Sequence, residues 1–272
     1  MQRGREGGRS GGTISALVGV RFHNLARTAL MLFNRNPRVV LLHQRDPSLY
    51  AQDGLWTYHA HCFLNDPQFQ RAYQRGIQAA SWDYGWPWRV HVGLWVASVC
   101  ARLDGAFVEC GTGRGFMASA ICEFLGWSER EFFLFDTFQP NKVDESGIQH
   151  DDAPKLPIYA DGPQAVAANF VEWPGVRLVV GKVPDTLNFP GTPHKVACVH
   201  VDMNHPDAEV AAIHHFWPRL TLGGMLLLDD YGYAGFDESR KAADHAAQQL
   251  GFHILSLPTG QGLAIKQSAC TS

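Results

Sequence analysis

Short apolar runs and amphipathic stretches alternate along the chain from residue 106 onward. A short apolar run is typical of a strand buried on both faces of a sheet, and the amphipathic stretches have helical spacing. The pattern predicts strands at 106–110, 131–135, 176–180, 195–201 and 223–229, and helices at 115–126, 162–170, 206–219 and 235–250. Strands that alternate with helices indicate a mostly parallel sheet.

The C-terminal end of the pattern differs from the rest. Residues 252–257 and 263–266 are two short strand-like runs joined by Pro-Thr-Gly-Gln-Gly. Such a link makes a hairpin, so the last strand is expected to run antiparallel to the others. We therefore predict an α/β fold, with a seven-stranded, mostly parallel, doubly wound sheet, helices on both faces and a C-terminal antiparallel hairpin.

Upstream of residue 106 the sequence predicts a helical N-terminal extension. Residues 1–12 are rich in Gly and Arg and are expected to be disordered. Residues 14–33 have an amphipathic pattern that is too polar for a membrane span and too broken for a secretory signal. This helix either packs on the body of the protein or on a second copy, as a homodimer element, or it lies on an anionic membrane surface.

The rest of the extension reads as helix and loop. Residues 34–80 are expected to be helical and loop-like, with a helix body at 68–80, and another helix is expected at 89–103. No internal repeat is visible. The chain is therefore divided into a tail at 1–12, a helical extension at 13–87 and a sheet domain at 88–272.

Composition narrows the class of protein. The chain has 272 residues, of which 46% are hydrophobic and 18% are charged, as in a soluble globular protein. The formal net charge of −3 gives no reason to expect a nucleic-acid partner. The six cysteines include no C-x-x-C pair, and four of them fall in predicted strands or helices, which favours a reducing cytoplasm and argues against zinc.

The most informative motif is Phe-Val-Glu-Cys-Gly-Thr-Gly-Arg-Gly at 107–115. Its glycines allow a sharp turn close to a ligand, and the next helix directs its N-terminal N–H groups at that ligand. A dinucleotide-binding turn would have glycine at position 116, where this chain has phenylalanine. The next strand ends at Asp136, which is placed to bind ribose hydroxyls or, alternatively, only to cap the following turn. Together these features predict an adenosine-type cofactor.

Two later strands also end in acidic residues. Asp202 follows one strand, and Asp229 and Asp230 follow another. Three carboxylates at one sheet edge would repel each other unless a cation neutralised them, and oxygen ligands alone suit Mg²⁺, Mn²⁺ or Ca²⁺. The alternative is that one or two of them cap helices, as Asp230 could do for the next helix. The connection 137–161 is long and acidic, and we interpret it as a lid.

These motifs, in this order, resemble the macrocin O-methyltransferase family. The resemblance covers roughly residues 88–266 and rests on the glycine motif together with Leu-Phe-Asp-Thr-Phe, Val-Pro-Asp-Thr-Leu, His-Val-Asp-Met-Asn and Gly-Gly-Met-Leu-Leu-Leu-Asp-Asp-Tyr. It implies a class I, Rossmann-like methyltransferase domain that uses S-adenosylmethionine, a divalent cation (usually magnesium) and a hydroxyl acceptor, often on a sugar. The cofactor residues that it implies, with their neighbours in the same turns, are Glu109, Gly111, Thr112, Gly113, Gly115, Asp136 and Thr137. The metal ligands that it implies are Asp202, Asp229 and Asp230.

The chain departs from the family pattern after Asp202. The family usually reads Asp-x-Asp-x-Tyr there, whereas this chain has Asn204 and Pro206 in the second acid's and the tyrosine's positions. His205 follows Asp202 at the place where catechol-type methyltransferases, which look similar here, carry a lysine base. An imidazole is suited to accepting a proton near neutral pH. Asp202 and His205 are thus the two candidates for the general base.

The sequence therefore predicts a cation-dependent O-methyltransferase that acts on a small molecule or a glycan. Alternatives are a nicotinamide-dependent oxidoreductase on a similar sheet and a non-catalytic relative that binds a glycan or a partner protein. The sequence does not identify the acceptor hydroxyl. We expect a cytoplasmic protein, with residues 14–33 as a candidate peripheral membrane element.

Overall fold

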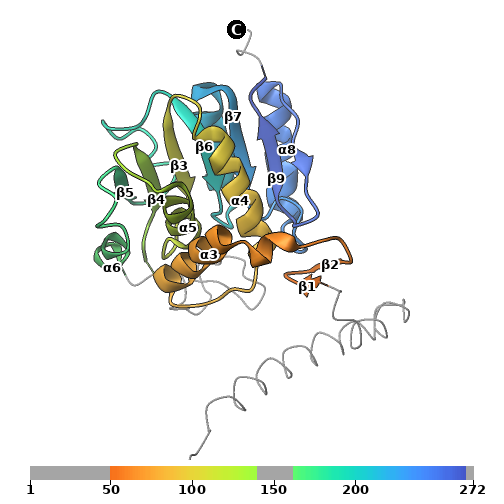
Figure 1. The fold of residues 1–272 in the computed structure, drawn as a ribbon. Coiled ribbons are helices and arrows are strands. Elements are labelled where there is room, and N and C mark those ends of the chain that lie inside the picture. The colour runs from red at the N-terminus through yellow and green to blue at the C-terminus, as the bar shows by residue number, and fades with distance from the viewer. Residues whose placement is uncertain (1–49, 140–161, 268–272) are drawn as a thin grey trace, which may run out of the picture. The chain divides into compact units, whose positions relative to one another are not determined.

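The computed structural model of the protein describes residues 50–139 and 162–267 (Figure 1). The described residues form two units. Residues 50–51 and 56–59 belong to one unit, and residues 52–55, 60–139 and 162–267 belong to the other. The predicted tail at 1–12, the helix at 14–33 and nearly all of the 137–161 loop lie outside the described residues. The second unit holds the sheet and every candidate site residue.

A seven-stranded sheet forms the centre of this unit. Its order is β5 (Val176–Val180), β4 (Phe132–Asp136), β3 (Ala106–Cys110), β6 (Val196–Val201), β7 (Leu220–Leu228), β9 (Gly262–Ile265) and β8 (Leu255–Ser256). Strands β3 to β7 pair in parallel, and β9 pairs antiparallel with both β7 and β8. The predicted sheet and its C-terminal hairpin are confirmed.

Helices cover both faces of this sheet. The bounds are η1 Cys62–Asn65, α3 Pro67–Ala80, α4 Pro87–Cys100, α5 Phe116–Leu125, α6 Pro163–Ala168, α7 Pro206–Phe216, η2 Trp217–Arg219 and α8 Asp237–Leu250. Figure 1 shows α4 and α5 in front of the sheet and α8 behind it. A proline in the first turn begins α3, α4, α6 and α7, and a left-handed glycine ends α5 and α8, as expected for helix boundaries. No helix in the described part of the chain is long and apolar enough to span a membrane.

Alternate residues along the central strands pack into two apolar cores, one on each face of the sheet. In β4, Phe132 and Leu134 pack with α3, α4 and α5, whereas Phe133 and Phe135 pack with α7 and α8. All four side chains are buried. Because both faces of the strand are covered, the sequence of β4 is a continuous apolar run rather than an alternating one. The same reason explains why the strands were readable from the sequence.

One element contradicts the sequence-based expectation. Residues 34–80 were expected to be helical and loop-like, but β1 (Tyr50–Gln52) and β2 (Leu55–Thr57) form a two-stranded sheet. The turn between them is Asp53-Gly54, with φ of 50° and 71°. Positive φ at both central residues is typical of a type I′ hairpin, and Asp-Gly is its usual sequence. The dipeptide therefore carried a hairpin signal that the helical interpretation missed.

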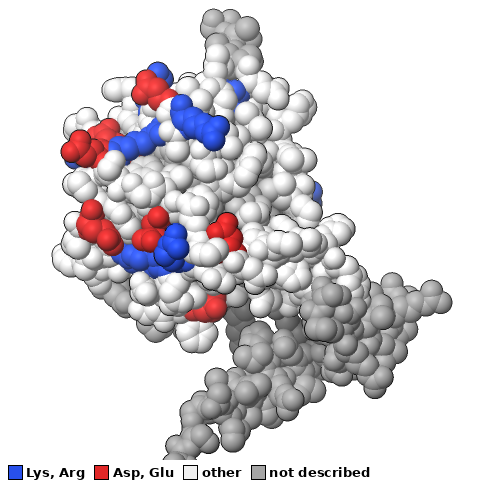
Figure 2. Space-filling view, viewed as in Figure 1, with Lys and Arg blue, Asp and Glu red and all other residues white. Residues whose placement is uncertain are grey.

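Acidic and basic side chains lie close together on the face drawn in Figure 2, and most of that surface belongs to uncharged residues. Ion pairs among the described residues include Arg75–Glu172, Arg177–Glu131 and Lys195–Asp104. Among the described residues on this face, no extended patch of one sign is visible. This distribution offers no broad attraction for a polyanion.

Arg130 holds the chain that follows the C-terminal end of α4. Its guanidinium donates to the carbonyl oxygens of Ala101 at 2.9 Å and Leu103 at 2.6 Å, and to that of Gly105 at 2.9 and 2.5 Å. It also lies over the ring of Phe107, 4.7 Å from the ring centroid. Carbonyl groups past a helix end have no hydrogen-bond partner within the helix. Here one arginine donates hydrogen bonds to three such carbonyls in the segment between α4 and β3.

We expect Arg130→Met to lower the free energy of unfolding by about 2 kcal/mol, because the half-buried carbonyls of Leu103 and Gly105 lose a charged donor. Arg177→Met is the matched control, since Arg177 is exposed and pairs only with exposed Glu131. The control should change stability by less than about 0.5 kcal/mol. Urea denaturation of the two variants measures the difference, and equal losses would contradict the assigned role.

Candidate active site

The carboxyl ends of four neighbouring strands meet at one edge of the sheet. Just past β6, the backbone N–H of Asp202 donates to the carbonyl oxygen of Cys110 at 2.8 Å. Just past β7, the N–H of Asp229 donates to the carbonyl oxygen of Val201 at 2.9 Å. These ladder bonds fix the two acidic strand ends beside the end of β3, where the glycine turn begins.

Gly111 allows the glycine turn to approach the neighbouring strand end. Its φ is 89°, in the left-handed region that favours glycine. A Cβ at this position would lie 1.8 Å from the backbone oxygen of Asp202. No side chain fits there, so glycine is required both by conformation and by space.

Gly115 serves packing rather than the cavity. It precedes α5 with φ of 89°, and a Cβ there would lie 2.6 Å from the ring of Phe170. Phe170 is buried between the turn and the layer of helices. Gly115 is the only residue of the predicted cofactor set that does not line the main cavity described below.

Asp136 fastens the glycine turn to the end of β4. Its carboxylate accepts hydrogen bonds from the backbone N–H of Gly113 at 2.8 Å and of Phe138 at 2.7 Å, and from the Thr137 hydroxyl at 3.3 Å. Burial raises the pKa of Asp136 although these hydrogen bonds act in the opposite direction. The turn-capping alternative considered from the sequence is thus present, and it leaves a lone pair on Oδ2 for a further donor.

A cavity of about 620 Å³ runs along this sheet edge. Its size lies in the range of small-molecule and cofactor sites. Apart from Gly115, every residue of the predicted site lines it, namely Glu109, Gly111, Thr112, Gly113, Asp136, Thr137, Asp202, His205, Asp229 and Asp230. Aromatic side chains complete one wall, among them Tyr84, Trp86, Tyr233 and Phe236.

The three acidic strand ends converge inside this cavity. One carboxylate oxygen from each of Asp202, Asp229 and Asp230 lies within 4.8 Å of the other two. Asp229 is buried, and the other two are partly exposed. Oxygen atoms at such separations can surround a hard cation.

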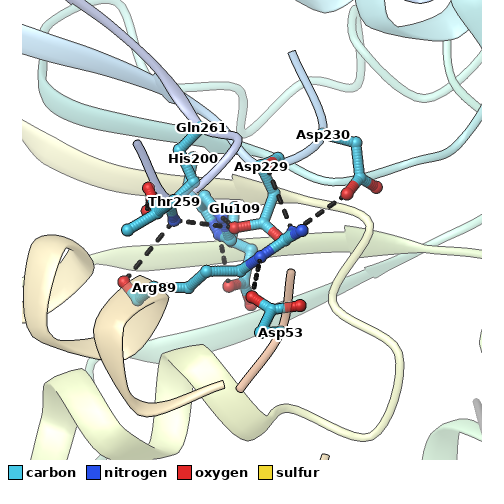
Figure 3. Close-up of polar contacts among 8 residues, drawn as sticks. All are labelled: Asp53, Arg89, Glu109, His200, Asp229, Asp230, Thr259 and Gln261. Carbon is cyan, nitrogen blue, oxygen red and sulfur yellow. Dashed lines mark hydrogen bonds and ion pairs between the residues drawn. The ribbon is translucent and has the colours of Figure 1, made fainter. Parts of the chain in front are cut away.

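Arg89, which the sequence did not single out, pairs with two of these acids (Figure 3). It lies in the first turn of α4 with 3% of its surface exposed. One Nη atom lies 2.5 Å from Asp229 Oδ2 and 2.9 Å from Asp230 Oδ1, and Nε lies 2.7 Å from Asp53 Oδ2. Its guanidinium stacks over the ring of Tyr233 at 4.7 Å. The cluster therefore contains a permanent positive charge.

His200 connects the acidic cluster with the base of the glycine turn. Its Nδ1 lies 2.9 Å from Glu109 Oε1, and its Nε2 lies 3.6 Å from Asp229 Oδ1. Gln261 donates to the same Asp229 oxygen at 2.8 Å and itself accepts from Thr259. Figure 3 shows these side chains in one continuous group beneath the strand ends.

Electrostatics in the cluster follow from burial and from these pairs. Burial alone would lower the pKa of His200, but its contacts with Asp229 and Glu109 raise that pKa to about 10. Burial would raise the pKa of Asp229, yet Arg89 and His200 hold it below its usual range. For Asp230, burial and the neighbouring Asp229 raise the pKa to about 6 despite Arg89.

Asp202 differs from the other two acids. Burial and the charges of Asp229 and Asp230 raise the pKa of Asp202 well above its usual range. The two basic side chains nearby oppose this shift but do not cancel it. Asp202 is therefore the carboxylate of the cluster that gains most from added positive charge, or from a proton.

His205 lies at the entrance of α7 rather than inside the cluster. It is the residue before the first turn of the helix, its side chain is exposed, and it lines the cavity. Asn204 before it adopts a left-handed φ of 55°, which asparagine tolerates better than most residues. This kink turns the chain from β6 into α7 next to the acids.

The comparisons with known proteins agree with this geometry. Residues 108–231 match the model of a methyltransferase domain family. These residues, from β3 to just past the end of β7, are thus similar to a methyltransferase domain. No curated protein sequence matches the chain at a significant level.

Solved structures show that the methyltransferase fold extends beyond the matched residues. The O-methyltransferase NovP is 19% identical over 66% of this chain and 80% of its own, with a TM-score of 0.54. CalS11, a TDP-rhamnose 3'-O-methyltransferase of calicheamicin biosynthesis, is 14% identical over 74% of this chain and 95% of its own, with a TM-score of 0.50. At this level of identity the likeness establishes the fold alone.

The methyltransferase domain should show a pH-dependent stability that originates at His200. Because folding raises the pKa of His200 from its ordinary value of 6.5 to about 10, the stabilisation is complete below about pH 6 and is lost as the pH rises through about 10. In the presence of chelator, the free energy of unfolding of wild type should fall by on the order of 2 kcal/mol more than that of His200→Gln between about pH 7 and 10. Denaturant titrations at each pH measure this difference, and parallel curves for the two proteins would contradict it.

Proposed function

We propose that this protein is a divalent-cation-dependent O-methyltransferase that transfers a methyl group from S-adenosylmethionine to a hydroxyl group of a small molecule or a sugar. One observation carries the proposal. The glycine turn at Gly111 and the converging carboxylates of Asp202, Asp229 and Asp230 lie on one sheet edge and line one cavity. A donor and an acceptor held there would be neighbours, and such proximity supplies a large part of the rate enhancement in group transfer.

The comparisons and the sequence support the choice of an oxygen acceptor. NovP is named as an O-methyltransferase, and CalS11 as a methyltransferase of a sugar hydroxyl. The motifs from 107 to 231 resemble the macrocin O-methyltransferase family, which also methylates hydroxyl groups. This resemblance motivates the assignment of the acceptor class.

The donor end of the cavity has the polar groups that S-adenosylmethionine needs. We assign Gly111, Thr112 and Gly113 to the wall beside the methionine part, and Asp136 with Thr137 to the ribose hydroxyls. Glu109 is 1% exposed, and its Oε2 atom has no hydrogen-bond partner among the described residues. A buried acceptor of this kind suits the ammonium group of the donor.

The acceptor end has an oxygen-only donor set that fits a divalent cation. The carboxylates of Asp202, Asp229 and Asp230 converge within 4.8 Å, and two of them pair with the guanidinium of Arg89. The converging set consists of carboxylate oxygens, which favour Mg²⁺, Mn²⁺ or Ca²⁺ as the ion. Such an ion, when bound, would lower the pKa of an acceptor hydroxyl.

Proton removal falls to a residue at the end of β6. Asp202 lies among the converging acids, and its raised pKa makes it a better proton acceptor than an ordinary carboxylate. His205 lies farther out, on the same segment and with an exposed ring. We assign Asp202 to the acceptor side of the cluster and keep both residues as candidate bases, to be separated by their variants.

Asp202→Asn should retain S-adenosylmethionine binding within about threefold and lose methyl transfer by about 100-fold or more, because the acceptor side is disrupted while the glycine turn is intact. Asp185→Asn, an exposed carboxylate outside the cluster, is the control. Donor binding is measured by calorimetry, and transfer from methyl-labelled S-adenosylmethionine to catechol, methyl rhamnoside and TDP-rhamnose by product mass. Undiminished transfer in excess chelator would refute the metal role, and donor binding without transfer to any hydroxyl would refute the O-methyltransferase.

For His205→Gln we expect a loss of about tenfold in the transfer rate if the imidazole accepts the acceptor's proton. The loss should shrink at higher pH, where more of the acceptor hydroxyl ionises without help. His214→Gln, another exposed histidine on α7, controls for loss of a surface imidazole. A pH–rate profile unchanged from wild type would leave Asp202 as the base.

A further inference from the structure

Arg89 takes up ligand atoms that a cation would need. Its Nη atom binds Asp229 Oδ2 at 2.5 Å and Asp230 Oδ1 at 2.9 Å, and both side chains are largely buried. The remaining Asp229 oxygen accepts from Gln261 at 2.8 Å. Both oxygens of Asp229 are thus engaged by the protein itself.

A guanidinium and a divalent cation on the same carboxylates repel each other. At separations of a few ångströms the repulsion between such charges is strong at protein-like dielectric constants. Burial intensifies the effect, because Arg89 is 3% exposed and cannot be screened by solvent. Simultaneous full bonding to both cations is therefore unfavourable.

Asp53 provides Arg89 with a partner outside the acidic cluster. Its Oδ2 atom lies 2.7 Å from Nε of Arg89, on the side of the guanidinium away from the Nη atom that binds the two strand-end acids. Asp53 is in the turn between β1 and β2, so it is not part of the converging set. This pair can persist when the bonds to Asp229 and Asp230 are weakened.

We infer that Arg89 is a positioning residue that holds Asp229 and Asp230 in place and competes with the divalent cation for them, while Asp53 retains Arg89 when the cation binds. The inference rests on the metal site of the proposed function and adds a determinant of its affinity. It predicts opposite effects for the two partners. Loss of Arg89 strengthens cation binding, and loss of Asp53 weakens it, since Arg89 then has only the strand-end acids as anionic partners.

Titration of the full chain with Mn²⁺ tests this inference. Electron paramagnetic resonance measures the concentration of free Mn²⁺, and this readout does not depend on turnover. We expect the Mn²⁺ dissociation constant of Arg89→Gln to be about tenfold or more below that of wild type, and that of Asp53→Asn to be a few-fold above it. Arg89→Lys keeps the charge and should stay within about threefold of wild type. Donor binding by calorimetry confirms that each variant is folded.

Arg89→Gln is also expected to have a lower Tm than wild type in chelator and to recover it with Mn²⁺, because its unpaired acids repel each other until the ion binds. Should this variant fail to fold at any Mn²⁺ concentration, Asp53→Asn decides alone, and an unchanged dissociation constant there overturns the inference. Equal or weaker Mn²⁺ binding by folded Arg89→Gln also overturns it.

The same titrations separate this inference from the proposed function. If wild type binds no Mn²⁺ but Arg89→Gln does, the competition is supported, and the metal is removed from the proposed reaction. If both bind as expected but no hydroxyl is methylated, the proposed function fails and the competition stands. If neither binds Mn²⁺, both the metal site and the inference are wrong.

Discussion

Mutual repulsion among carboxylates at the end of the central sheet is the constraint to which the site responds. Parallel strands β6 and β7 deliver Asp202, Asp229 and Asp230 to one place because neighbouring parallel strands end on the same side. Unopposed negative charges at these distances would destabilise the folded chain. Arg89, on helix α4, and His200, in strand β6, each pair with Asp229 and offset part of that repulsion.

This arrangement ties the site to the helical layer that precedes the sheet in sequence. Arg89 is on α4, and its partner Asp53 is in a tight Asp-Gly turn upstream. The pairs join residues 36 and 140 positions apart along the chain. Removing one partner would leave a buried charge without its counter-ion, which usually costs more than the pair contributes. The sheet edge that carries the acids and the packing of α4 are therefore energetically linked.

The sequence predicted the elements of the sheet because each strand is buried on both faces and so forms an unbroken apolar run, as in β4. It also predicted the acids at the edge, because the position of a residue at a strand end can be read from the same runs. It could not predict the partners of those acids. Arg89 stands at the start of a helix with no local pattern around it, and its role depends on which helix packs against which strand. The dual use of Asp136, as a cap for the glycine turn and as a candidate ribose ligand, likewise required the fold.

The charge of the cluster bears directly on the reaction that it is proposed to support. Methyl transfer discharges a sulfonium, and carboxylates near the reacting carbon stabilise the charged donor more than the transition state. Once the proton of an acceptor hydroxyl has left the site, the alkoxide would add a negative charge beside a cluster in which carboxylates outnumber the basic side chains Arg89 and His200. Arg89 already pairs with three carboxylates, so its charge is not available to stabilise a forming alkoxide. In the proposed reaction the acceptor side would therefore need additional positive charge, and the strand-end acids are the described side chains placed to bind a cation.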